Sequence, residues 1–122
     1  TIFDPTQPEQ PRIRYDDTAR AWAPEEAKRA FFHDCTPEVA GWAAANFRRQ
    51  VWTSSRQVCE LDAWLDVEAQ YVLCTEDRGP LPEWARRRAR DWLGVEAIEL
   101  PGGHAPMLSR PAALAGVLTR DL

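Results

Sequence analysis

Two short segments, residues 70–75 and 95–100, constrain the fold of this chain most strongly. The first is mostly apolar and rich in residues that favour strands, and such runs are typical of strands covered on both faces of a parallel sheet. The second segment also predicts a strand. Between them, residues 82–93 place apolar side chains at helical spacing, and Gly94 follows as a suitable helix stop. The alternation of strand, helix and strand predicts an α/β fold with right-handed connections on a parallel sheet.

Three further helices are expected around this unit. Residues 24–30 start with proline and two acids, which suit the first turn of a helix. Thr36 is a good N-cap before Pro37 and predicts a helix over 37–49. Its expected inner face comprises Val39, Trp42, Ala43 and Phe47. Ser109 is expected to cap a last helix with inward-facing Leu114, Val117 and Leu118.

The sheet predicted from these segments is too small to stand alone. A parallel sheet of two strands leaves unpaired edges on both sides and buries little surface. Residues 1–23 are proline-rich and charged, and the path of residues 50–69 is not assigned beyond anchoring by Leu61, Trp64 and Leu65. We therefore expect the chain to form only part of a larger sheet.

Composition excludes several classes of function. The 122 residues are 44% hydrophobic and 28% charged, which is the globular range. The net charge of −4 provides no basic field for nucleic acid or an anionic membrane. No apolar run is long enough to span a bilayer, and the N-terminal residues do not resemble a signal peptide. Three cysteines without a C-x-x-C pair suggest reduced thiols in a cytoplasmic protein, with neither a disulfide framework nor a metal site.

Asp77 and His104 are the candidate catalytic residues. Each lies just past the end of one of the predicted strands, and reactive groups of open parallel sheets collect at the carboxyl ends of strands. If the strands are neighbours, a carboxylate can orient an imidazole that takes a proton from a nucleophile. Gly102 and Gly103 would let the loop before His104 turn sharply. Taken singly, an aspartate after a strand is more often a turn former, and a loop histidine more often ordinary surface.

Other candidates have simpler explanations. Glu76 could replace Asp77 as the acid, although strand alternation places the two on different sides. His33 and Asp34 could pose as a second acid–base pair, but we expect them to make structural hydrogen bonds. The arginines of residues 86–90 are interpreted as a solvated outer helix face. Most tryptophans are expected in the core, with Trp22 and Trp52 near a cap or an interface.

Two segments resemble the α/β-hydrolase superfamily. Residues 71–78, YVLCTEDR, resemble its strand and acid loop, and residues 101–111, PGGHAPMLSRP, resemble its histidine loop. The H-x-x-M-L-S-x-P pattern is most similar to the esterase and hydroxynitrile-lyase branch. The resemblance implies that Asp77 is the triad acid and His104 the general base, while Met107 and Leu108 line or support the substrate pocket. It also implies that residues 1–30 are the end of a cap and residues 31–122 the C-terminal portion of the core domain.

The resemblance also shows what the chain lacks. Complete members are longer and carry a G-x-S-x-G nucleophile motif, whereas no serine here (Ser54, Ser55 and Ser109) is flanked by glycines in that way. An N-terminal half or a partner chain would therefore supply the nucleophile. The implied reaction is hydrolysis of a small ester-like substrate without cofactor or metal, with cyanohydrin-type lyase chemistry as a variant.

Two other hypotheses remain open at the level of the sequence. In one, the chain is a catalytically inactive half-hydrolase that binds a partner or forms a homo-oligomer through its exposed strand edge. In the other, the missing half carries an aspartate nucleophile, as in a dehalogenase-type α/β-hydrolase.

Overall fold

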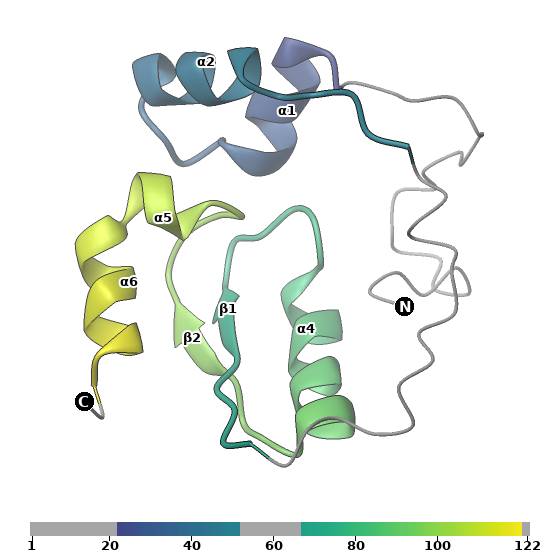
Figure 1. Ribbon diagram of the computed structural model, residues 1–122, viewed down its shortest axis with the longest axis vertical. Coiled ribbons are helices and arrows are strands. Elements are labelled where there is room, and N and C mark those ends of the chain that lie inside the picture. The colour runs from purple at the N-terminus through teal and green to yellow at the C-terminus, as the bar shows by residue number, and fades with distance from the viewer. Residues whose placement is uncertain (1–21, 52–66, 121–122) are drawn as a thin grey trace.

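Two parallel strands form the centre of the described structure, a computed structural model that covers residues 22–51 and 67–120 (Figure 1). β1 (Val72–Cys74) and β2 (Ile98–Leu100) pair with Val72 opposite Ile98 and Cys74 opposite Leu100. The surrounding elements are α1 (Pro24–Phe31), α2 (Pro37–Ala45), α4 (Pro82–Arg88), the π-helix η1 (Ala89–Leu93), α5 (Pro106–Ser109) and α6 (Pro111–Leu118). The α/β fold with flanking helices, expected from the alternating segments, is confirmed.

Helices cover both faces of this small sheet. On one face, Leu73 of β1 packs against Trp84 and Ala85 of α4. On the other face, Cys74 and Leu100 pack against Val117 of α6. Because neighbouring strand residues point to opposite faces, consecutive residues of β1 enter two different apolar clusters. This explains why β1 is a continuous apolar run, whereas β2 alternates through the exposed Glu99.

Helices α1, α2 and α5 lie beyond the carboxyl ends of the strands (Figure 1). α1 and α2 pack on each other through small side chains, and Phe32 and Ala105 complete their cluster. Its buried members are Ala27, Phe32, Ala40, Ala43, Ala44 and Ala105. Since Ala105 directly follows His104, this helical layer is anchored on the histidine loop.

The helix expected over residues 82–93 changes its winding partway. It is α-helical to Arg88 and continues as a π-helix to Leu93, and Gly94 ends it at φ 67° as expected. An ideal α-helix would rotate Trp92 roughly 80° past Trp84. The wider π turns bring the two indoles edge to face at 6.1 Å, with the Arg88 guanidinium 4.7 Å from the Trp92 ring centroid.

α2 is shorter than the helix expected over 37–49. Thr36 caps it as predicted, because its hydroxyl accepts a hydrogen bond from the amide of Val39 at 3.3 Å. The helix ends at Ala45, where the side chain of Asn46 donates to the carbonyl of Trp42 at 2.8 Å. The expected inner face is also partly wrong, since Trp42 is 62% exposed and alanines form the buried side.

Two expectations for the C-terminal helix are wrong. Ser109 does not cap it, because Ser109 ends the separate helix α5 and its hydroxyl donates to the carbonyl of Ala105 at 3.4 Å. Leu118 is 56% exposed rather than inward-facing, whereas Val117 is buried and Leu114 is partly buried.

Expectations for residues 1–21, and for Trp52, Cys59, Leu61, Trp64 and Leu65, lie outside the described residues. Within the described ranges, no helix has the length and apolar character needed to cross a bilayer.

Candidate functional site

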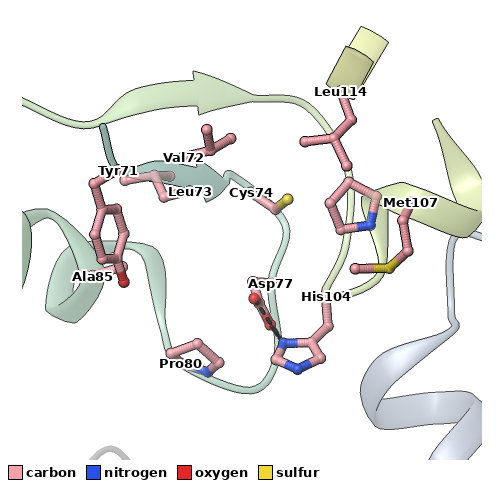
Figure 2. A pocket seen from close by; sticks show the side chains of 11 residues that line it. Tyr71, Val72, Leu73, Cys74, Asp77, Pro80, Ala85, His104, Met107 and Leu114 are labelled. Carbon is pink, nitrogen blue, oxygen red and sulfur yellow. Dashed lines mark hydrogen bonds and ion pairs between the residues drawn. The ribbon is translucent and has the colours of Figure 1, made fainter. Parts of the chain in front are cut away.

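Asp77 and His104 meet at the carboxyl edge of the sheet. Asp77 lies in the loop after β1 and His104 in the loop after β2, and Figure 2 shows their side chains pointing at each other. The imidazole Nδ1 is 3.0 Å from Asp77 Oδ2 and 3.1 Å from Oδ1. The contact expected from two residues at equivalent strand ends is therefore present.

The direction of the hydrogen bond in this pair follows from its chemistry. An ionised carboxylate can only accept hydrogen bonds, so Nδ1 of His104 is the donor, and in the neutral imidazole Nε2 then carries the lone pair. The Asp77 side chain is only 11% exposed, whereas that of His104 is 40% exposed. The carboxylate is thus sheltered while the second ring nitrogen faces away from it (Figure 2). An imidazole held in this way can accept a proton from an approaching group.

Gly79 completes the acid loop. Its amide donates to Asp77 Oδ1 at 2.7 Å, which gives the carboxylate a second hydrogen bond besides the one from the imidazole. A Cβ at this position would lie 3.1 Å from His104 Nδ1 and 3.2 Å from Asp77 Oδ1. A residue without a side chain is therefore needed for the backbone to approach the pair so closely.

Backbone hydrogen bonds hold the acid and histidine loops side by side. The amide of Thr75 donates to the carbonyl of Leu100 at 3.0 Å, and the amide of Glu76 donates to that of Gly102 at 2.9 Å. Gly102 adopts φ 124°, a conformation that side chains disfavour. The pairing of β1 with β2 thus continues past the strands as far as Glu76, next to the acid, and Gly102, two residues before the base.

His33 and Asp34, in the turn between α1 and α2, contact both loops. Nε2 of His33 donates to the carbonyl of Glu76 at 3.0 Å, since a carbonyl oxygen only accepts. Asp34 Oδ2 accepts from the amide of Gly103 at 2.8 Å. The structural role expected for this pair is the one the geometry shows.

The pKa of Asp34 reflects these contacts. Burial raises the pKa, but the hydrogen bond from the Gly103 amide and the attraction of His33 lower it more. The single hydroxyl hydrogen of Ser109 is donated to the carbonyl of Ala105, so the Gly103 amide is the principal partner of the carboxylate. The pKa of Asp34 therefore lies below its ordinary value, and Asp34 is ionised at neutral pH.

Two cavities open beside His104. The larger, of about 660 Å³, is lined mostly by aromatic and apolar side chains, among them Trp22, Phe31, Phe32, Phe47 and Met107. The Phe31 ring lies 5.0 Å from the His104 ring, centroid to centroid, and Trp22 meets Phe31 edge to face at 4.9 Å. Trp22 thus lies at the cavity wall, and its expected place near a cap or an interface stays a prediction.

The smaller cavity, of about 240 Å³, lies between the pair and the sheet (Figure 2). Met107 lines both cavities and is 58% exposed, as a pocket residue would be. Leu108 lines neither cavity and instead packs against the cluster of α1 and α2, so that it supports the loop from behind.

Cys74 also borders the smaller cavity, but burial and the charge of Asp77 raise the pKa of its thiol, which disfavours a nucleophilic thiolate.

The remaining candidates from the sequence are placed outside this centre. The exposed Glu76 contributes its backbone to the loops, while Asp77 takes the place beside the imidazole. Arg86 pairs with Glu99 at 2.6 Å and Arg90 with Glu96 at 2.9 Å, as expected for an outer helix face. In the part of the chain that the structure describes, no three His, Cys, Asp or Glu side chains are grouped to hold a metal ion.

Sequence reasoning missed three contributors to the site. Gly79 was only part of a loop, Phe31 carried no signal of contact with His104, and the partners of Asp34 could not be named. One feature of the sequence could have indicated them: a glycine close in sequence to a reactive residue. At Gly79 and Gly103 the backbone passes too close to neighbouring side chains to leave room for a Cβ.

The fold and the acid–base pair define a class of protein. A family model described as "Alpha/beta hydrolase family" matches residues 2–117, and the chain therefore belongs to the α/β-hydrolase family. Among curated proteins, the chain is similar to "Alpha/beta hydrolase nvfD" of Aspergillus novofumigatus, with 29% identity over 89 residues. That match covers 71% of this chain but 35% of the relative, so the chain spans about a third of the relative's length.

Proposed function

We propose that this chain supplies the acid and the general base of a serine hydrolase that cleaves carboxylic esters. The observation that carries the proposal is the pair of hydrogen-bonding distances between His104 Nδ1 and the carboxylate of Asp77. Family membership adds a hydrolase-type fold. The esterase assignment rests on the resemblance of the histidine loop to the esterase and hydroxynitrile-lyase branch.

The proposed reaction assigns one role to each residue. Nε2 of His104 removes the proton of a serine hydroxyl as its oxygen attacks the ester carbonyl, and the imidazolium returns that proton to the departing alcohol. Water then attacks the acyl-enzyme, with His104 again removing and returning a proton. Asp77 holds the tautomer and stabilises the imidazolium. The serine and the oxyanion-stabilising amides come from the nucleophile-bearing part of the complete protein.

The cavities suggest which esters would bind. We propose that the aromatic-lined cavity next to His104 takes an apolar part of the substrate, because such a surface favours apolar groups.

In this proposal residues 1–30 are the end of a cap and residues 31–122 belong to the core domain. The reduced cysteines Cys35 and Cys74 are compatible with a cytoplasmic location.

Turnover of p-nitrophenyl esters by the full-length protein tests the proposal. We expect His104→Gln to lower kcat by about 10³-fold or more and Asp77→Asn by roughly 10⁴-fold, since both remove the oriented base. Glu76→Gln should retain nearly full activity, because its side chain is not hydrogen-bonded to His104 in the structure. Undiminished turnover in the His104 variant would refute the assignment.

A further inference from the structure

We propose that Asp34 and His33 are positioning residues that set the placement of His104 relative to Asp77. The inference rests on the proposed function and deepens it, because it adds a device that holds the acid–base pair in working geometry. Neither residue touches the imidazole of His104 through a hydrogen bond of its own. Both act through the backbone that carries the pair.

His33 and Asp34 bond to the residues that directly precede the acid and the base in the sequence. His33 bonds to the carbonyl of Glu76, which directly precedes Asp77, and Asp34 bonds to the amide of Gly103, which directly precedes His104. Two consecutive residues of one turn therefore hold the two positions from which the acid and the base project. A shift of this turn would move both loops, whereas loss of either bond would release only one.

Close approach makes the Asp34 contact specific. A Cβ on Gly103 would lie 2.7 Å from Asp34 Oδ1 and 2.7 Å from His33 Nε2. Atoms do not approach so closely without displacement, so the glycine amide and the carboxylate fit only when position 103 lacks a side chain. The bond is also charge-assisted, because Asp34 is ionised, and such bonds are stronger than neutral ones.

The turn that carries the two residues is itself held in place. The amide of Cys35 donates to the carbonyl of Phe32 at 3.1 Å and closes the turn around His33 and Asp34. Phe32 is buried in the cluster of α1 and α2. The acid loop has a further tie to α1, because Arg78 Nη1 donates to the carbonyl of Arg29 at 3.0 Å. The helical layer thus provides a fixed support on which both loops are set.

Steady-state kinetics of the full-length protein separates positioning from mere stability. We expect Asp34→Ala to lower kcat by about 10-fold to 100-fold with KM changed less than about twofold, because a small displacement of the base slows proton transfer. Asp34→Asn keeps an oxygen that accepts from Gly103 and should restore most of kcat. Glu38→Ala, which removes an exposed acid in the first turn of α2, should leave kcat unchanged. Rates are normalised to active sites titrated with a fluorophosphonate.

A second measurement does not depend on turnover. In Asp34→Ala we expect the Gly103 amide to exchange with solvent faster and the NMR signal of the His104 Nδ1 proton to weaken. Asp34→Ala with unchanged kcat per titrated site and an unchanged Nδ1 signal would overturn the positioning role, while a large loss in His104→Gln would leave the hydrolase assignment standing. If His104→Gln loses nothing, the hydrolase assignment fails, and the Gly103 exchange rate and the Nδ1 signal still decide for or against positioning.

Discussion

At the scale of single residues, the site depends on backbone that passes very close to two side chains. Gly79 lies against both members of the pair, and its amide holds the carboxylate. Its lack of a side chain is therefore as necessary to the geometry as the charge of Asp77. This requirement can be tested with a single methyl group.

Gly79→Ala should lower kcat toward esters by about tenfold while leaving the fold intact, because the imidazole and carboxylate must each move by a few tenths of an ångström. Gly41→Ala is the matched control, since a Cβ there would meet nothing within 4 Å. It lies inside α2 and should stabilise the protein by up to about 1 kcal/mol with kcat unchanged. Equal kcat values in the two variants would contradict the close-approach argument.

The charge of Asp34 should also appear in the pH dependence of stability. Because its folded pKa lies below the ordinary value of 3.8, its contribution is fully present above that value and is lost as pH falls through the folded pKa. We therefore expect the difference in unfolding free energy between the wild type and Asp34→Asn to be constant near neutral pH and to shrink in acid. Urea titrations at a series of pH values measure it, and a difference that grows in acid would reverse the assigned sign.

The sequence could predict the contact between Asp77 and His104 but not the residues that support it. Asp77 and His104 each follow a β-rich run, and the carboxyl ends of neighbouring parallel strands meet at one edge. The partners of Asp34 depend on the path of a loop 69 residues away, which no local pattern specifies. The contact of Phe31 with His104 depends in the same way on how a helix packs over a loop.

At the scale of elements, local signals predicted the start of α2 better than its end. Thr36 and Pro37 marked the beginning of α2 correctly, whereas Asn46 ended it earlier than expected by bonding back to Trp42. The buried face of α2 was also hard to predict from its alanine-rich sequence. Ala40, Ala43 and Ala44 pack inward, whereas the larger Trp42 does not. Packing of small residues against α1 decided the orientation.

Thr36→Ala should therefore destabilise the protein by about 1 kcal/mol, since one amide at the start of α2 loses its acceptor. Thr36→Ser keeps the hydroxyl and should cost little. Thr119→Ala removes a hydroxyl that does not cap the start of a helix. Among the described residues, that hydroxyl donates to the carbonyl of Ala115 near the end of α6, so this variant serves as a comparison for the loss of a threonine hydroxyl. The midpoints of urea unfolding measure all three, and a Thr36→Ala variant as stable as Thr36→Ser would exclude the cap.

At the scale of the whole molecule, the described residues form a piece of an α/β-hydrolase. β1 pairs with β2 in a sheet of these two strands within the described ranges, and the chain spans about a third of its curated relative. The edge of β1 not paired with β2 is the place where further strands of the family fold would add. We propose that the nucleophile-bearing half occupies this edge, and that a second copy is its substitute when that half is absent.

Light scattering on residues 1–122 alone should accordingly give a mass that rises with concentration. Addition of the nucleophile-bearing half should lower that self-association and restore ester turnover. A stable monomer that neither self-associates nor binds the other half would contradict the proposal for the strand edge.

We propose that His104, held by Asp77, activates a serine outside residues 1–122. Reaction of the full-length protein with a fluorophosphonate, followed by peptide mapping, is the decisive test. We expect one adduct on a serine outside these residues, formed at least about 10³-fold more slowly in His104→Gln. An adduct on Ser54, Ser55 or Ser109, or equal labelling rates in the two proteins, would contradict it.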